Sequence, residues 1–225
     1  ANFADNDRDL YRRMPLRLVV LLEEGFPGAW QNKGALRLIA RGTFNRTYEL
    51  RLIPGINDKP LFYIGMHEIT NRQFKPFAPF IGQQAGAPDA IVAEFIYPTA
   101  AAFCNWLNMK YGLRNGARQR LPYTCSLGDR PRDWGGKKRD WRRQADSSGM
   151  RLPNRDEWQR AMVYSEHAGL QNMSGGVAEL IDFGNPAMEY FFDIQGKLKK
   201  TVGREYGSPS GGLQGCRLLL PSKEE

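Results

Sequence analysis

The N-terminal part of the chain has a hydrophobic pattern typical of β-structure. Short apolar runs are separated by turn residues, and within residues 47–53 polar and apolar side chains alternate, as in a strand with one buried face. The runs predict strands at residues 16–22, 36–40, 47–53 and 61–65. Residues 1–15 are polar and charged, and we expect an N-terminal tail or one short helix there.

Two helices are predicted from their N-terminal capping residues. Thr70 is followed three residues later by Gln73, which is the spacing of a capping box, and Pro76 limits this helix to a short one. Asn154 and Glu157 have the same spacing and predict another helix. The apolar residues on one face of that helix are Trp158, Ala161 and Met162.

The longest predicted helix begins around Pro98. Apolar residues recur along it at helical spacing, and they are Phe103, Trp106, Leu107 and Tyr111. After Gly169 the chain is rich in glycine, and we expect irregular structure up to a final strand at residues 216–220. No internal repeat or linker interrupts the chain, so residues 16–225 are expected to form a single domain.

The composition is that of a folded protein with many turns. Of the 225 residues 41% are hydrophobic and 25% charged, as in ordinary globular proteins, while 24 glycines and 14 prolines favour turns over a helical bundle. The longest apolar run, residues 18–22, is far shorter than the roughly 18 residues that a membrane span requires. A transmembrane protein is therefore not expected.

The charge is unbalanced toward positive side chains. With 32 basic and 24 acidic residues the formal net charge is +8, which favours acidic partners, although solubility alone also accounts for it. No nucleic-acid recognition motif accompanies the charge, so no nucleic-acid partner is expected. Basic residues are densest at residues 130–143, called the basic segment below.

The basic segment combines arginine and tryptophan, which dominate protein–protein interfaces. Its candidate partner-binding residues are Arg130, Arg132, Trp134, Lys137, Lys138, Arg139, Trp141, Arg142 and Arg143. We expect these residues to bind a protein partner. The alternative is a solvated loop with both tryptophans packed against the domain.

Few residues are available for zinc or disulfide chemistry. The cysteines are Cys104, Cys125 and Cys216, and no two of them form a Cys-x-x-Cys pair. The only histidines are His67 and His167. A zinc cluster is therefore not expected, whereas one disulfide is possible.

Five stretches of the sequence follow one another in the order found in a known protein family. They are residues 61–74, 97–107, 151–161, 172–180 and 215–218, called the five motif blocks below. The third block, which begins Arg-Leu-Pro-Asn-Arg-Asp-Glu-Trp, is the most specific. The blocks resemble motifs of the formylglycine-generating enzyme (sulfatase-modifying factor) family. This resemblance implies an α+β, C-type-lectin-like fold with short helices, small sheets and much irregular chain.

The catalytic residues of that family are not matched. Its oxidases hold copper with two cysteines near the C-terminus, whereas residues 184–215 contain none. Its iron-dependent branch uses a set of histidines, and the two histidines of this chain lack the required spacing. The resemblance therefore implies a pseudoenzyme with no catalytic residues, no copper and no iron. The alternatives are a metal-dependent maturation oxidase with a non-standard active site and a lectin-like ligand-displaying module.

One metal site of the family is matched residue by residue. In the family an Asn side chain, two backbone carbonyls and a Glu side chain bind calcium, and the matching residues are Asn172, Gly175, Val177 and Glu179. Oxygen ligands of these types suit calcium. The resemblance thus implies one structural calcium ion, and the alternative is a hydrogen-bonded loop without metal.

A basic, inactive member of this family is expected to act by binding. The resemblance is to periplasmic members that act upstream of a transmembrane Ser/Thr kinase in the post-translational activation of type VI secretion. The expected partner is the extracytoplasmic region of that kinase. The chain starts at Ala1 without Met, which fits an exported protein whose signal peptide was removed and equally fits a trimmed chain.

Overall fold

The computed structural model describes helices, strands and their close connections. The described residues are 17–21, 35–40, 46–53, 62–92, 96–110, 121–125, 141–144, 147, 149–173, 178–182, 188–192, 198–202 and 214–221. The tail expected at residues 1–15 and most of the basic segment lie outside them. The described part combines helices with small sheets, so the predicted α+β class is confirmed.

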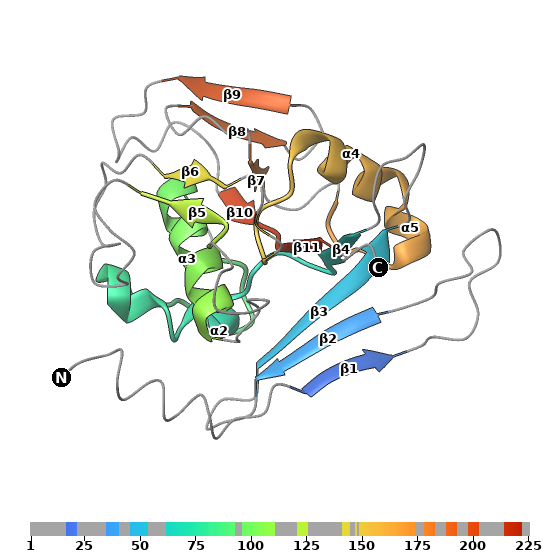
Figure 1. Cartoon of the computed structure of the whole chain (residues 1–225), viewed down its shortest axis with the longest axis horizontal. Helices are drawn as coiled ribbons and strands as arrows, with labels where there is room; N and C mark the ends of the chain where they lie inside the picture. The colour runs from blue at the N-terminus through green and yellow to red at the C-terminus, as the bar shows by residue number, and fades with distance from the viewer. Residues whose placement is uncertain are drawn as a thin grey trace.

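The larger sheet has five antiparallel strands in the order β1-β2-β3-β4-β11 (Figure 1). They are β1 (Arg17–Leu21), β2 (Ala35–Ala40), β3 (Arg46–Ile53), β4 (Phe62–Gly65) and β11 (Leu219–Pro221). The four predicted N-terminal strands are confirmed to within one residue at each end. In β3 the alternating pattern buries Tyr48, Leu50 and Leu52.

A second sheet has four strands in the order β10-β7-β8-β9. They are β7 (Ala178–Ile181), β8 (Met188–Phe192), β9 (Leu198–Val202) and β10 (Gln214–Cys216). Strand β10 runs parallel to β7, and the other neighbours are antiparallel. The expectation of irregular structure after Gly169 is therefore wrong. These strands are short and form by pairing, partly with strands distant in the sequence, so their local pattern is weak.

The single strand predicted at residues 216–220 is two strands in different sheets. The chain leaves β10 after Cys216, passes through Arg217 and Leu218, and enters β11 at Leu219. Both connecting residues are buried. Residues 214–221, called the C-terminal segment below, therefore join the two sheets (Figure 1).

The helices begin where their capping residues predict. Thr70 and Gln73 form a capping box at the start of α2 (Asn71–Phe74), and Asn154 and Glu157 form one at the start of α4 (Arg155–Val163). The other helical elements are η1 (Ala78–Ile81), α3 (Tyr97–Lys110) and α5 (Ser165–Ala168). None of the helices in the described part is long and apolar enough to cross a membrane.

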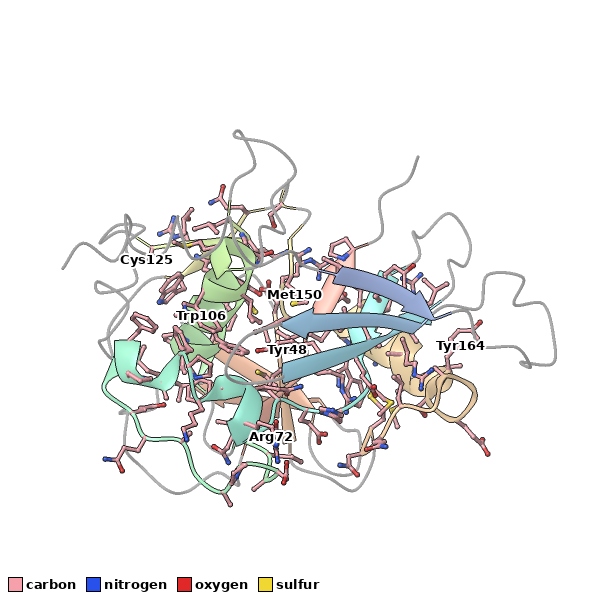
Figure 2. All side chains as sticks on the ribbon, turned by 90° about the horizontal axis from the view of Figure 1, so that it is seen from below. Tyr48, Arg72, Trp106, Cys125, Met150 and Tyr164 are labelled. Carbon is pink, nitrogen blue, oxygen red and sulfur yellow. The ribbon has the colours of Figure 1, made fainter. Side chains whose placement is uncertain are left out.

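Two hydrophobic clusters hold these elements together. The first, called the α3 cluster below, includes four aromatic rings whose centroids lie 5.5–5.9 Å apart in neighbouring pairs. They belong to Phe74, Phe77, Phe103 and Trp106. Figure 2 labels Trp106, which lies on α3. The second cluster packs Trp158 and Ala161 of α4 with residues of β3, β4 and β11.

Candidate functional site

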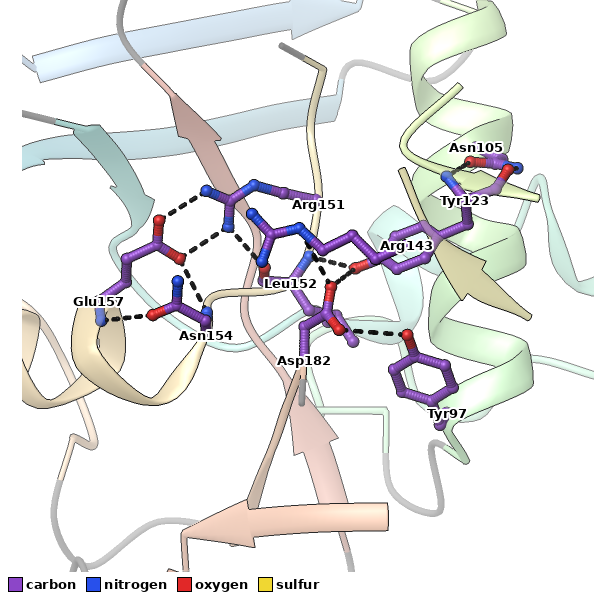
Figure 3. A network of polar contacts seen from close by, with 9 residues as sticks. All are labelled: Tyr97, Asn105, Tyr123, Arg143, Arg151, Leu152, Asn154, Glu157 and Asp182. Atoms are coloured by element: carbon purple, nitrogen blue, oxygen red, sulfur yellow. Dashed lines mark hydrogen bonds and ion pairs between the residues drawn. The ribbon is translucent and has the colours of Figure 1, made fainter. Parts of the chain in front are cut away.

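A buried polar network surrounds Asp182, which directly follows β7 (Figure 3). Its fully buried carboxylate accepts hydrogen bonds from Tyr97 Oη at 3.2 Å and from Tyr123 Oη at 3.1 Å. Arg143 Nε lies 3.6 Å from Asp182 Oδ2. A buried carboxylate needs such partners because it has lost its hydration. These four residues are called the Asp182 cluster below.

Three elements bring partners to Asp182. Tyr97 is the first residue of α3, Tyr123 lies in β5 (Tyr123–Thr124), and Arg143 lies opposite Tyr123 in β6 (Arg142–Arg143). The side chain of Asn105 in α3 forms two hydrogen bonds with the backbone of Tyr123 in β5. Its Nδ2 donates to the Tyr123 carbonyl at 2.7 Å, and the Tyr123 N–H donates to its Oδ1 at 3.1 Å. The helix therefore sets the positions of both tyrosines.

Both tyrosine hydroxyls of the cluster are protonated. Burial raises the pKa of Tyr97 and of Tyr123 well above the ordinary value of 10, and the charge of Asp182 raises both pKa values further. Tyr123 Oη also accepts a hydrogen bond from the Leu152 N–H at 3.0 Å. The Asp182 cluster is thus a buried hydrogen-bonded network in which both tyrosines act as hydrogen-bond donors to the carboxylate.

A second ion pair, which is partly buried, joins Arg151 and Glu157 (Figure 3). Arg151 donates to the two carboxylate oxygens at 2.7 and 2.6 Å. Burial acts to raise the pKa of Glu157, but the hydrogen bonds and charge of Arg151 outweigh it and lower this pKa. Glu157 also accepts from the Asn154 N–H at 2.8 Å. One carboxylate therefore both caps α4 and neutralises Arg151.

A third buried ion pair joins the first and fifth motif blocks. Glu68 Oε2 lies 3.5 Å from Arg217 Nη2, and neither side chain is exposed. Arg217 also donates to the carbonyls of Gly65 and Gln171, each at 2.8 Å. The guanidinium thereby connects the end of β4 to the turn that follows α5.

The predicted calcium site is described only at its two ends. Asn172 is exposed and has a φ of 57°, a left-handed conformation that asparagine adopts more readily than most residues. Glu179 lies in β7, opposite Gly215 of β10. Gly175 and Val177 lie outside the described residues. The donor set fits calcium chemically, because it offers amide, carbonyl and carboxylate oxygens.

The basic segment is described only at its C-terminal end. Trp141 is 1% exposed and packs in the α3 cluster, which corrects its prediction as a partner-binding residue. Arg143 lies against Asp182, so it also faces the interior, whereas Arg142 is exposed. The candidates outside the described residues are Arg130, Arg132, Trp134, Lys137, Lys138 and Arg139.

The structure has no disulfide bond among the three cysteines, although the sequence allowed one. Cys104 and Cys216 are buried, and Cys125 is half-buried. Burial raises the pKa of Cys104, and the charge of Asp182 raises it further. A protonated thiol is a poor nucleophile and a poor metal ligand. Within the described ranges no three His, Cys, Asp or Glu residues form a group that could hold a metal ion.

The Asp182 cluster could not be foreseen from the sequence. The local signal is an acidic residue directly after the short apolar run that ends β7. Nothing near Asp182 identifies Tyr97, 85 positions earlier, or Tyr123, 59 positions earlier, as its hydrogen-bond donors.

No family model matches this chain, and neither the curated proteins nor the solved structures give a match. The functional assignment therefore depends on the residues and geometry of the chain itself.

Proposed function

We propose that this protein is a non-enzymatic member of the formylglycine-generating enzyme family, of the kind represented by the TagR protein of type VI secretion systems. In this proposal its α+β architecture is the C-type-lectin-like fold of that family. The protein resides in the periplasm and binds the extracytoplasmic region of a transmembrane Ser/Thr kinase. Binding promotes the phosphorylation that activates secretion after translation.

The observation that carries the proposal is that polar residues of the motif blocks bind one another. Glu68 of the first block pairs with Arg217 of the fifth, and Arg151 pairs within the third. Tyr97 of the second block donates to Asp182, which lies just beyond the fourth. Groups engaged inside the fold are not available to a substrate. The motif blocks can therefore resemble those of the family because they stabilise the same fold, without a shared catalytic activity. This supports a binding function over a catalytic one.

The buried thiols support a function without copper. Copper chemistry in this family needs two reactive thiolates, and thiolates suit Cu(I) because both partners are soft. Cys104 and Cys216 both pack in the α3 cluster, and burial keeps the pKa of Cys104 high. Neither thiol is exposed to a substrate. The alternative function of a maturation oxidase therefore gains no support from them.

The proposal includes one structural calcium ion in the loop from Asn172 to Glu179. Asn172 would supply an amide oxygen, Gly175 and Val177 backbone carbonyls, and Glu179 a carboxylate. When bound, calcium would neutralise the carboxylate and would be a partner for the two carbonyl oxygens.

In this proposal the kinase binds the basic segment. Arg142 is exposed in β6, where the basic segment joins the described fold. Trp134 is the remaining tryptophan candidate for the contact, because Trp141 is buried. The net charge of +8 favours an acidic surface on the kinase. Charges at the rim of an interface act mainly on the association rate, whereas a buried aromatic residue acts mainly on affinity.

Binding kinetics with a purified kinase ectodomain test this proposal. Arg142→Ala is expected to slow association about threefold, and Trp134→Ala to raise Kd at least about tenfold. Raising the salt concentration from about 0.1 M to about 1 M shortens the Debye length from about 10 Å to about 3 Å and should slow association further. Arg155→Ala is the charge-matched control, because Arg155 is an exposed arginine in α4, outside the basic segment.

Two outcomes would count against the proposal in different ways. No binding to the ectodomain at any salt concentration contradicts the proposed function. Binding that responds neither to salt nor to the two substitutions contradicts the assignment of the basic segment and places the interface elsewhere.

A further inference from the structure

Met66 differs from the other described methionines in what its sulfur contacts. It directly follows β4, and Arg51 of β3 donates from Nη2 to its Sδ at 3.6 Å. The backbone of Met66 is held on both sides, because its N–H donates to the Glu49 carbonyl and its carbonyl accepts from the Gln171 N–H, each at 2.8 Å. Both Met66 and Arg51 are half-buried, so a small molecule can approach the sulfur.

The other methionines whose side chains are described belong to the hydrophobic clusters. Met150 is buried in the α3 cluster and Met109 packs against it. Met173 is buried in the second cluster and Met162 packs against it. An oxygen added to any of these four sulfurs would place a polar group among apolar side chains, which is costly. Met66 belongs to neither cluster, and its sulfur already has a charged hydrogen-bond donor beside it.

The contact with Arg51 suits a sulfoxide better than a thioether. A thioether sulfur is a weak acceptor, whereas oxidation makes the methionine side chain polar. Because Nη2 and Sδ are 3.6 Å apart, an oxygen bonded to the sulfur can lie about 2.9 Å from the same nitrogen, the usual N–H···O distance. A hydrogen bond from a guanidinium is also stronger than one from a neutral donor.

We propose that Met66 is an oxidation site for peroxides and that Arg51 binds the resulting sulfoxide. The sulfur lone pair attacks one oxygen of hydrogen peroxide, so that an S–O bond forms as the O–O bond breaks. The other oxygen leaves as hydroxide, takes the proton of the transferred oxygen and departs as water. The sulfur loses the two electrons that the peroxide gains. This modification goes beyond the proposed function and does not depend on the kinase.

The expected effect of the modification is a stronger link between two strands. Arg51 lies in β3 and Met66 at the end of β4, and the two strands are neighbours in the larger sheet. A charged hydrogen bond to the sulfoxide replaces the weak contact with the thioether. Oxidation at Met66 is therefore tolerated by the fold, whereas oxidation at Met162 weakens the packing of the second cluster.

Peptide mapping by mass spectrometry after exposure of the folded chain to hydrogen peroxide tests the site. Met66 sulfoxide is expected to form at least about tenfold faster than Met150 sulfoxide, because Met150 is fully buried. Met162 is half-buried like Met66 and serves as the reference for a reachable sulfur.

The role of Arg51 is tested by the effect of oxidation on Tm. The parent chain carries Met109→Leu and Met162→Leu, which roughly conserve volume and remove the other half-buried methionines of the described part. Oxidation is expected to lower Tm by about 4 °C more in Arg51→Gln than in the parent, because the sulfoxide loses its charged donor. Arg72→Gln is the charge-matched control and should behave as the parent, since Arg72 is exposed and pairs with Asp89.

Two results would overturn the inference. Oxidation of Met66 that is no faster than that of Met150 shows that peroxide does not reach the sulfur. A change in Tm on oxidation that is equal in the parent and in Arg51→Gln shows that Arg51 does not bind the sulfoxide. If Arg51→Gln does not fold, Arg51→Lys takes its place with about half the excess loss, because lysine keeps the charge but not the planar donors. Kinase binding is decided by its own measurement in every case.

Discussion

A carboxylate buried as completely as that of Asp182 is tolerated only when other groups replace its lost hydration. Two tyrosine hydroxyls supply hydrogen bonds, and Arg143, whose side chain is 24% exposed, supplies a partly screened opposite charge. The two tyrosines are not equivalent. Tyr123 Oη donates to Asp182 and accepts from the Leu152 N–H, whereas Tyr97 Oη donates to Asp182.

Tyr123→Phe is therefore expected to destabilise the protein more than Tyr97→Phe. Loss of one hydrogen bond to a charged group should cost about 1.5 kcal/mol at position 97, and a second, buried N–H left without its acceptor should bring the cost to about 3 kcal/mol at position 123. Urea denaturation at pH 7 measures both. The substitutions remove the same atom from two buried rings, so each is a control for the other, and equal losses would contradict the second hydrogen bond.

Predictions from the sequence succeed at the residue scale where the interacting residues are close in the chain. Thr70 and Gln73 form a capping box, and the sequence predicts it because the two residues are only three positions apart. Trp134 and Trp141 belong to the same basic segment and have the same chemistry, so the sequence does not show which of them is buried. Trp141 is buried because it directly precedes β6, which pairs with β5 next to α3.

Helix α4 contains the information for its own formation, whereas the strands of the second sheet do not. The capping box at Asn154 and the apolar face that carries Trp158 lie within a few residues, so the prediction of α4 is confirmed. Strand β7 pairs with β10, and that partner begins at Gln214, far along the chain. A strand whose stability comes from such distant pairing leaves a weak local pattern.

The cap of α4 predicts a pH dependence of stability. Because Arg151 lowers the pKa of folded Glu157 below its ordinary value of 4.5, the charged carboxylate stabilises the native state above that pH. This contribution is lost as the pH falls through the lowered pKa of the folded state. Glu157→Gln is expected to cost about 2 kcal/mol at pH 7, and the difference from wild type should shrink below about pH 4.5.

Urea denaturation between pH 7 and pH 3 measures this effect. Asp156→Asn is a suitable control, because Asp156 is an exposed carboxylate in the same first turn of α4. A penalty for Glu157→Gln that stays constant down to pH 3 would show that the charge of Glu157 does not stabilise the fold.

In the molecule as a whole, the C-terminal segment joins a five-stranded and a four-stranded sheet and carries Arg217 between them. The sequence predicts the α+β class, four strands of the larger sheet and the helix starts. It does not predict that residues 214–221 change sheets, because a run such as Cys-Arg-Leu-Leu-Leu reads locally as one strand. The buried Arg217 marks the break, since its donors go to backbone carbonyls of Gly65 and Gln171.

The central claim, that this protein acts by binding and regulating a kinase, is tested most directly by kinase activity itself. Vesicles that carry the full-length kinase, with its extracytoplasmic region outward and ATP enclosed, are incubated with increasing amounts of the protein, and phosphate incorporated into the kinase is measured. We predict that phosphorylation rises and saturates at the protein concentration that saturates binding to the ectodomain. Phosphorylation that stays unchanged at saturating protein would contradict the claim.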